Sequence, residues 1–287
     1  MHYPVMAAEA LELLAIRPDG VYVDVTAGLG GHAGLIAGRL PAGLLIACDR
    51  DPASLEAARR NTAEWASRIW YRQATFADLR ETLAEARIER IDGLLADLGV
   101  SRYQLTAPER GFSFLTDSPI DMRMDRTRGV TAGEIVNTIA EEALADLIFQ
   151  LGGERRARKL ARALVRARPL RSTRHLADVV ERAVPRTGKK IHPATQTFMA
   201  LRMAVNEEIE QLDRLLEEGP ETLAPGGRMA VISFTSTEDR KVKERFRGLA
   251  SDGRAGILTK RPLVPGEPEL AANPASRSAK LRALEMT

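Results

Sequence analysis

Cysteine is almost absent from this chain: Cys48 is the only one among 287 residues. A single thiol cannot close an intrachain disulfide, and it cannot supply the cysteine pairs of a zinc site. The four histidines, at positions 2, 32, 175 and 192, are scattered without the spacing of metal ligands, so no metal site is expected. Low cysteine content is typical of a reducing compartment, and we expect a cytoplasmic protein.

Long apolar runs are also missing, since none approaches the ~20 residues that a membrane-spanning helix needs. The opening residues MHYPVMAAEALELL lack the basic and apolar regions of a signal peptide. We therefore expect no membrane partner. With 44% hydrophobic and 28% charged residues, the composition is that of a globular protein with a sizeable core.

Charge is nearly balanced over the whole chain, at a net +3, but it is unevenly distributed. Residues 154–174 hold nine basic residues against one acidic residue, a net charge of +8 that leaves −5 for the rest. An apolar stripe of Leu160, Leu164 and Val165 predicts a helix in this segment. Like charges four residues apart disfavour an isolated helix, so the segment indicates an anionic partner, for which nucleic acid is the natural candidate.

The alternative is a solvated helix face whose long side-chain stems cover apolar surface. A second basic cluster in PRTGKK would extend the charged surface. The candidate RNA contacts are Arg155, Arg158, Lys159, Arg162, Arg166, Lys189 and Lys190.

The clearest local motif is VYVDVTAGLGGH, at residues 21–32. A short apolar run predicts a buried strand, which leads into three glycines, Gly28, Gly30 and Gly31. Glycines at such a turn allow the backbone to approach a ligand closely, although alone they would fit an ordinary tight turn. A second apolar stretch ends on Asp49, where a carboxylate can accept hydrogen bonds from both ribose hydroxyls. Together these features indicate a cofactor that contains a nucleoside.

Asp24 distinguishes between two such cofactors. It lies at the end of the first strand, where a carboxylate would repel the pyrophosphate of a dinucleotide but would suit an ammonium or sulfonium group. S-adenosylmethionine (SAM) carries both of these groups and no phosphate. The glycine spacing also departs from G-x-G-x-x-G. The residues therefore favour SAM, and an NAD-dependent oxidoreductase is the alternative.

The first hundred residues alternate strand and helix signals. We predict strands at 21–25, 44–49, 68–74 and 91–97, and helices at 6–16, 31–40, 52–66 and 77–88. From about 105 to 205 the signals are helical, at 131–139, 141–151, 154–167 and 173–183, and a long helix at 194–217 leads to a strand at 228–234. A helix at 237–249 and an antiparallel pair at 255–260 and 278–286 follow. The pattern predicts an α/β fold: a parallel, doubly wound sheet interrupted by a helical insert.

Ligands of doubly wound sheets bind beyond the carboxyl ends of the strands. The fourth strand ends at Asp97 and is followed by Gly99, so we expect this loop to border the same cleft as the glycine turn. The loop after the fifth strand projects from the same edge. Ser236 and Asp239 there have the spacing of a capping box at the start of a helix.

Longer motifs extend over nearly the whole chain: HYPVMAAEA, DVTAGLGGH, CDRDP, DGLLADLGVS, PERGFSF, DSPIDMRMD, GERRARKLARALV, HPATQTFMALRMAVNEE, LAPGGRMAVISF and NPASRSAKLRA. The block PERGFSF…PIDMRMD is the most specific, because no general requirement of a fold produces it. On these motifs the chain resembles the RsmH (MraW) family of methyltransferases, which modify cytosine N4 in bacterial small-subunit ribosomal RNA. The resemblance implies a Rossmann-like class I SAM-dependent methyltransferase sheet with an inserted all-helical domain.

The resemblance also implies where the domains and the site lie. The sheet domain would span residues 1–104 and 206–287, and the substrate-recognition insert residues 105–205. The implied partner is 16S rRNA in the small ribosomal subunit, at a decoding-centre cytidine of the C1402 type, and a homodimer is left open. The cofactor contacts carried over by position are Gly30, Gly31, His32, Asp49, Phe76, Asp97 and Gln104, which Asp24 joins on the reasoning above.

Physical roles follow for these residues. Gly30, Gly31 and His32 would line the methionine end of SAM, and Phe76 would pack against the adenine face. The amine of cytosine is a poor nucleophile because its lone pair is delocalised into the ring. The site must therefore align the amine with the methyl group and offer it a hydrogen-bond acceptor. Asp97, or a backbone carbonyl near Leu98 and Gly99, is the hypothesised acceptor.

Two loops depart from the family pattern. Where the family usually reads GVSSxQLD this chain has Arg102 and Thr106, and where it reads SFHSLEDR this chain has Thr235 and Thr237. Both loops border the predicted cleft, so the departures bear on substrate choice and turnover. They leave a second hypothesis, a catalytically silent RNA-binding assembly factor on the same fold.

Overall fold

The computed structural model describes residues 4–185 and 192–287, which form two compact units. The first unit comprises Met1–Gly99 and Ile209–Thr287, and the second comprises Val100–Glu208. Among the described residues, no helix is long and apolar enough to cross a bilayer.

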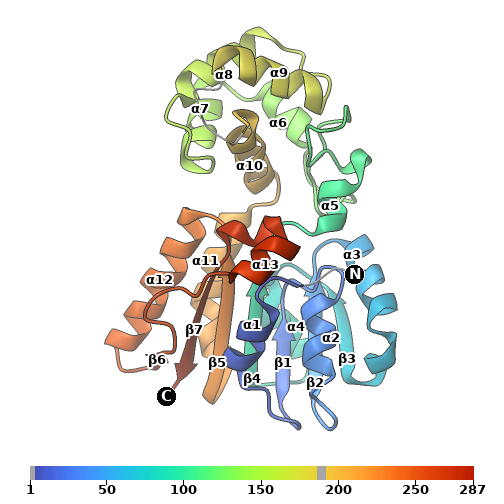
Figure 1. Cartoon of the computed structure of the whole chain (residues 1–287), viewed down its shortest axis with the longest axis vertical. Helices are drawn as coiled ribbons and strands as arrows, with labels where there is room; N and C mark the ends of the chain where they lie inside the picture. Colours follow the sequence, from blue (N-terminus) through green and yellow to red (C-terminus); the bar gives the residue numbers. More distant parts are fainter. Residues whose placement is uncertain (1–3, 186–191) are drawn as a thin grey trace. The chain divides into compact units, whose positions relative to one another are not determined.

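The first unit is built on one seven-stranded sheet (Figure 1). Its order is β3-β2-β1-β4-β5-β7-β6, and β7 runs antiparallel to both of its neighbours, whereas β1 to β5 pair in parallel. This confirms the predicted doubly wound sheet and the predicted antiparallel closing pair. The strands are β1 (Val21–Asp24), β2 (Leu44–Asp49), β3 (Ile69–Gln73), β4 (Ile91–Asp97), β5 (Leu223–Ser233), β6 (Ala255–Ile257) and β7 (Lys280–Met286).

Successive side chains of a strand point to opposite faces, so each strand feeds two cores. In β2, Leu45 and Ala47 join one cluster, while Ile46 and Cys48 join the other. A strand buried on both faces must be apolar at nearly every position, which explains the uninterrupted run LLIAC.

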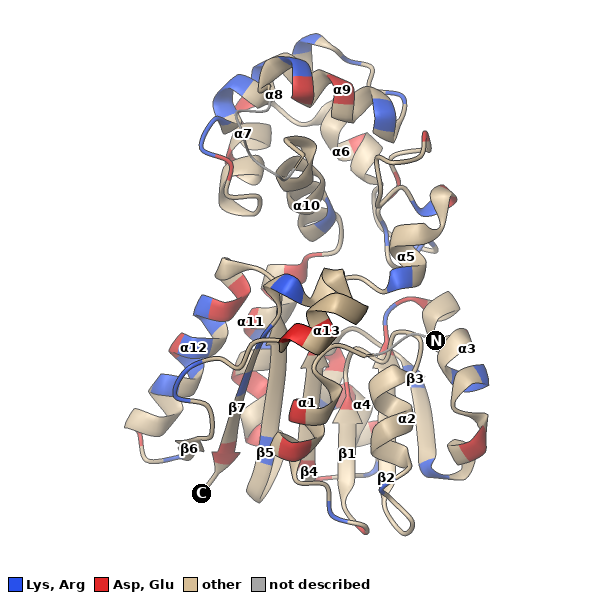
Figure 2. Ribbon diagram, in the orientation of Figure 1, with Lys and Arg blue, Asp and Glu red and all other residues tan. Residues whose placement is uncertain are grey.

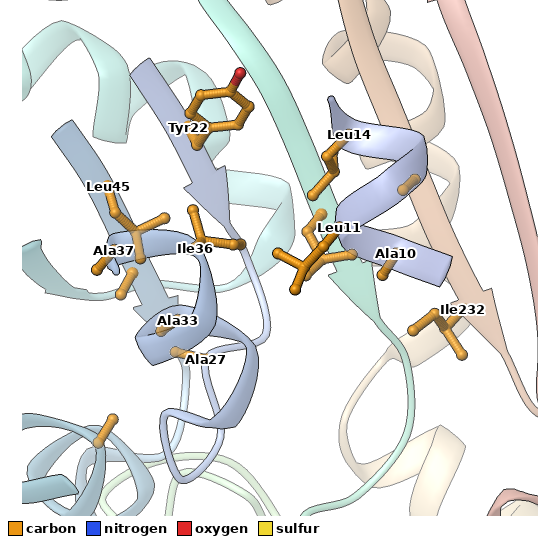
Figure 3. Packing of buried hydrophobic residues seen from close by; sticks show 14 of the residues in the cluster. Ala10, Leu11, Leu14, Tyr22, Ala27, Ala33, Ile36, Ala37, Leu45 and Ile232 are labelled. Atoms are coloured by element: carbon orange, nitrogen blue, oxygen red, sulfur yellow. The ribbon is translucent and has the colours of Figure 1, made fainter. Parts of the chain in front are cut away.

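Helices cover both faces of the sheet. The first face carries α1 (Ala7–Leu14), α2 (Gly31–Ala37) and α3 (Pro52–Asn61), and the second carries α4 (Leu79–Ala86), α11 (Glu208–Thr222) and α12 (Ser236–Ser251). Figure 3 shows Leu11 and Leu14 of α1 and Ile36 of α2 in the first cluster, together with Tyr22 of β1. The remaining helical segments of this unit are η1 (Ala63–Arg68), η2 (Phe76–Asp78), α13 (Glu267–Ala272) and η4 (Pro274–Ser278).

The second unit has no strand among its described residues and is built from helices (Figure 1). Its core is apolar, with Leu144, Leu160 and Leu164 fully buried. The Arg168 guanidinium donates to the carbonyls of Val136 and Ile139, at 2.9 and 2.7 Å, and so satisfies groups at the end of α6. The helical segments are α5 (Arg102–Thr106), η3 (Pro108–Arg110), α6 (Ala132–Thr138), α7 (Glu141–Gln150), α8 (Ala157–Arg166), α9 (Thr173–Ala183) and α10 (Ala194–Val205).

The predicted long helix at 194–217 is wrong, because the chain forms two helices there, α10 and α11. Glu207 lies between them with a left-handed φ of 50°, which no α-helix accommodates. The Asn206 side chain holds this break within the second unit: its amide donates to the carbonyl of Met122 at 2.8 Å and its oxygen accepts the N–H of Met124 at 2.9 Å. A periodic apolar pattern continues through the break, so periodicity alone could not reveal it.

Two further boundaries differ from expectation. The helix predicted at 52–66 ends at Asn61, and residues 63–68 form the 3₁₀ segment η1. The fifth strand begins at Leu223, five residues before the predicted start at 228. The first four strands agree with the prediction to within one residue at each end.

The predicted capping box at Ser236 and Asp239 is also wrong by one residue. Thr235 is the N-cap of α12: its hydroxyl accepts the N–H of Glu238 at 3.2 Å, and the Glu238 carboxylate accepts the N–H of Thr235 at 2.8 Å. Two carboxylates of the sequence stand at plausible spacings, and the buried one, Glu238, closes the box. Asp239 instead accepts from Arg282 of β7 at 2.7 Å.

Thr235→Ala should therefore destabilise the protein by about 1–2 kcal/mol through loss of the cap. Ser236→Ala is the matched control, since the exposed Ser236 side chain caps nothing. Urea denaturation of the two variants measures the difference. Equal stabilities would contradict Thr235 as the N-cap. A larger loss for Ser236→Ala would favour the cap at Ser236 that the sequence predicted.

Candidate active site

Three aspartates end three neighbouring parallel strands. Asp24 is the last residue of β1, Asp49 of β2 and Asp97 of β4, and the register places Asp24 beside Ala47 and Leu95. The carboxyl ends of parallel strands lie at one edge of a sheet, so the three side chains belong to one region. This is the arrangement that the sequence predicted.

In the turn between β1 and α2, Gly28 and Gly30 are glycines for different reasons. Gly28 and Gly30 have left-handed φ angles of 53° and 87°. A Cβ on Gly30 would lie 3.0 to 3.2 Å from Thr62 and Ala58, so the turn packs tightly on α3. A Cβ on Gly28 would meet only the Thr26 carbonyl at 3.8 Å. Open space therefore remains at Gly28, whereas Gly30 is required for packing.

Asp49 connects two turns of the sheet edge. Its carboxylate accepts the N–H of Gly28 at 2.7 Å and the N–H of Asp51 at 2.8 Å. Asp51 in turn caps α3 by accepting the N–H of Ala53 at 3.0 Å. The residue predicted as a ribose contact thus also fixes the shape of the glycine turn, a structural role that the sequence did not indicate.

Thr26 is a functional residue that the sequence reasoning missed. Its hydroxyl accepts the N–H of Asp97 at 2.6 Å and lies 3.3 Å from Oδ1 of Asp24. Its own N–H donates to the same Asp24 oxygen at 3.0 Å. Thr26 therefore joins the end of β1 to the end of β4 and orients the carboxylate of Asp24. The sequence signal was a hydroxyl residue two positions after a strand-end aspartate, a common turn pattern.

His32, in the first turn of α2, lies within the same cluster. It is 5% exposed, and its Nε2 atom is 3.6 Å from Oδ2 of Asp97. Among the described residues, Oδ2 of Asp24 and Oδ1 of Asp97 are buried without a hydrogen-bond partner. Buried polar atoms are rarely left without partners, so these atoms indicate a polar ligand.

Burial dominates the electrostatics of this cluster. It raises the pKa of Asp24 to about 6, against the opposing effect of His32, and it raises the pKa of Asp49 to about 7, against the N–H donors of Asp51 and Gly28. Burial alone would lower the pKa of His32, but the carboxylates of Asp97 and Asp24 outweigh it, so the pKa is raised. Two carboxylates share the single imidazole of His32, so the cluster favours binding of a positively charged ligand.

Two other predicted cofactor residues lie in different settings. Phe76 begins η2 directly after β3, where it is half-buried against the second cluster of the sheet. Gln104 belongs to the second unit, where it is buried and completes a capping box for α5 with Ser101. The structure brings Asp24, His32 and Asp97 together within one unit. The roles predicted for Phe76 and Gln104 remain predictions.

The four departures from the family pattern have local explanations only in part. Thr235 is the N-cap described above, and the Thr106 hydroxyl donates to the carbonyl of Arg102 at 2.9 Å within α5. Arg102 is exposed, and nothing in the structure explains it or Thr237.

The nine basic residues at positions 154–174 divide into two sets. Four are tied to protein acceptors: Arg168 as above, Arg156 to Glu154 at 3.2 Å, Arg162 to Glu141 at 3.4 Å, and Arg174 to the carbonyl of Leu115 at 3.1 Å. The others are exposed and have no protein partner among the described residues. Figure 2 shows Lys and Arg gathered along α8 and the segment before it. The free set is Arg155, Arg158, Lys159, Arg166 and Arg171. Lys189 and Lys190 lie outside the described residues.

The strand order, the antiparallel β7 and the acidic cluster beside a glycine turn together define a class I SAM-dependent methyltransferase. Comparison with known families agrees: the chain belongs to the MraW methylase family, whose model matches residues 1–287. It is therefore a methyltransferase enzyme, and its cofactor is SAM.

Individual relatives match over the whole length. The chain is 65% identical over 286 residues to the ribosomal RNA small subunit methyltransferase H of Solibacter usitatus, with 100% of both chains covered. It is 48% identical over 282 residues to the protein of the same name from Cyanothece sp., covering 98% of this chain and 93% of the relative. A solved candidate rRNA methylase from Clostridium thermocellum matches 100% of both chains with a TM-score of 0.51 at 10% identity, which supports the fold alone.

The residues present fit this cofactor. SAM carries an ammonium and a sulfonium, and the site offers it buried carboxylate oxygens that lack a donor, at Asp24 and Asp97. The open space at Gly28 allows a ligand to approach the backbone. When bound, SAM supplies an activated methyl group on a sulfonium leaving group.

The raised pKa of Asp24 gives a prediction about stability. An acid whose folded pKa of about 6 exceeds its unfolded value of about 3.9 stabilises the fold only while it is protonated. Without ligand, the wild type should therefore lose about 2 kcal/mol relative to Asp24→Asn as the pH rises from 4 to 7. Urea denaturation at several pH values measures this difference. Burial also raises the pKa of Asp49, to about 7, and the pKa of His32 is raised by its carboxylate neighbours, so any slope that remains in the variant is theirs.

The same variant should bind SAM more weakly, and its affinity should lose the rise between pH 5.5 and 7.5 that we expect of the wild type. If the free energies of unfolding of the wild type and Asp24→Asn change with pH in parallel, the pKa of Asp24 is not raised in the folded protein.

Proposed function

We propose that this enzyme transfers the methyl group of SAM to the exocyclic N4 of one cytidine in 16S rRNA, within the small ribosomal subunit and of the C1402 type. The names of the full-length relatives support ribosomal RNA of the small subunit as the substrate class. The observation that carries the proposal is Asp97, whose unpartnered, buried Oδ1 lies at the end of β4 beside the cluster that would hold SAM.

The chemistry requires alignment and an acceptor. The amine nitrogen must lie ~3–3.5 Å from the methyl carbon and in line with the sulfur, because the nitrogen attacks the methyl group from the side opposite the departing sulfur. As the N–C bond forms and the C–S bond breaks, positive charge develops on nitrogen. A fixed carboxylate that accepts a hydrogen bond from the amine stabilises this charge and can take the proton that the nitrogen then releases. Asp97 would be this carboxylate, at the end of β4, where its backbone N–H donates to Thr26.

The chain's own residues would bind the cofactor in three parts. Asp24 and His32 lie where the methionine end would be held, and Asp49 would receive the ribose hydroxyls on the lone pairs that its two backbone donors leave free. Phe76 would pack against the adenine. Gln104 is a further cofactor contact that the family resemblance implies.

The second unit would hold the RNA. A cytosine inside a helix must leave its stack before its amine can enter such a site, and this costs a few kcal/mol. Phosphate contacts from the free cations of α8 supply binding energy that does not depend on sequence. The tied residues, such as Arg168, serve the fold instead.

The proposal is tested by methyl transfer from labelled SAM to small subunits isolated from cells that lack the protein. Nucleoside mass spectrometry should find N4-methylcytidine, and sequencing should place it at a single position. A different methylated nucleoside would overturn the base assignment. Absence of transfer, with SAM and RNA both bound, would favour the assembly-factor hypothesis.

Asp97→Asn should lower the rate constant of transfer by about 100-fold or more, because it removes the anionic acceptor. Because the site also offers the Asp97 carboxylate to SAM, the affinity for SAM should fall as well. Single-turnover kinetics at saturating SAM and RNA separate the two effects. A variant with normal turnover would leave the acceptor role to a backbone carbonyl.

The double variant Arg158→Glu/Lys159→Glu should weaken RNA binding and reduce its dependence on salt concentration, since each lost phosphate contact lowers the slope by about one. Arg247→Glu, an exposed charge reversal on α12 of the first unit, is the control for net charge. Filter binding over a range of salt concentrations measures both. If the double variant and the control behave alike, the basic face of α8 is only a solvated surface.

A further inference from the structure

The segment before α1 makes two contacts that the roles above do not use. Met6 is fully buried with a left-handed φ of 50°, and its carbonyl accepts the N–H of Ala10 at 2.9 Å, which starts α1. No side chain of this segment caps the helix. Instead, the N–H of Met6 donates to Oε1 of Glu269 at 2.9 Å, from α13 near the other end of the chain.

The same segment lies against the glycine turn. A Cβ on Gly31 would be 3.1 Å from Cβ of Pro4 and 3.3 Å from both Cγ and Cδ of its ring. Glycine at this position therefore allows the proline ring to pack directly on the backbone that precedes His32. Val5 is also buried, and its backbone contributes to the raised pKa of His32.

We propose that residues 4–6 form a wall of the cofactor site, and that Glu269 is a positioning residue that holds this wall against the glycine turn. The wall acts through Gly31 and His32, which are the residues expected at the methionine end of SAM. The inference goes beyond the proposed function, because it concerns cofactor binding and is independent of which base is methylated.

The hydrogen bond from Met6 to Glu269 stabilises a strained stretch of backbone. A residue with φ near 50° is strained unless it is glycine, and a bend of this kind persists only where other contacts over-determine it. The hydrogen bond to a carboxylate is stronger than one between neutral groups, and it fixes the Met6 N–H from outside the segment. Without it, the Pro4 ring loses the constraint that keeps it on Gly31.

A purely structural role for Glu269 must be separated from this one. A carboxylate at the start of a helix also stabilises it through the helix dipole, so removal of Glu269 could lower stability alone. The distinguishing measurement is SAM affinity in the absence of RNA, which a helix cap far from the ligand would not change.

Isothermal calorimetry with SAM should give an affinity about 10-fold weaker for Glu269→Ala. Glu269→Gln retains an acceptor oxygen for the Met6 N–H, so its affinity should remain within about 3-fold of the wild type. Glu267→Ala is the matched control, because Glu267 lies on the same helix and is exposed. It should bind SAM as the wild type does.

A double-mutant cycle tests the route through Pro4. Pro4→Gly should itself weaken SAM binding several-fold, and combining it with Glu269→Ala should add little, because both changes release the same wall. Fully additive losses would overturn the proposed route. A Glu269→Ala protein that melts at a lower temperature but binds SAM within 2-fold of the wild type would overturn the proposal as a whole.

Discussion

The structure depends on carboxylates that are held without water at the carboxyl edge of the sheet. Asp24 is fully buried and Asp49 half-buried at the ends of neighbouring parallel strands, and backbone N–H groups hold their oxygens in place. Burial disfavours their charge, as their raised pKa values show. Hydrogen bonds from the N–H groups of Thr26, Gly28 and Asp51 offset part of this free-energy cost. A cationic ligand recovers the cost when it binds, so part of the affinity for SAM is already stored in the protein without ligand.

The glycine turn shows how the same residues serve packing and binding together. Gly30 is pressed on α3 and Gly31 on Pro4, whereas only Gly28 faces open space. Glycines in such a motif are usually explained by the approach of a ligand. Here two of the three allow the turn to pack against α3 and against the segment before α1. Precise placement of His32 and Asp24 is the result, because neither the turn nor the first turn of α2 can shift without a clash.

Much of the fold could be predicted from the sequence because its signals are local. Strands such as LLIACD are apolar throughout and end on an acidic residue, and these features survive any tertiary context. The break at Glu207 could not be predicted, since it depends on contacts of Asn206 with residues more than eighty positions away. The site residues Asp24, Asp49 and Asp97 followed from strand ends, whereas the roles of Thr26 and Glu269 depend on pairings across the sheet and across the chain. The one-residue error at Thr235 arose because two acidic neighbours satisfy the same spacing rule.

The position of the insert has a consequence for synthesis of the chain. β4 is followed by the whole of Val100–Glu208 before its neighbour β5 appears, so the nascent sheet must wait with one edge of β4 unpaired. An unpaired strand edge is a template for pairing with other chains. The insert is continuous in sequence and can fold while the sheet is still incomplete. The risk of aggregation during translation therefore depends on how quickly the residues after Glu208, about the last quarter of the chain, are synthesised. A pause in translation just after Glu208 would carry the highest risk.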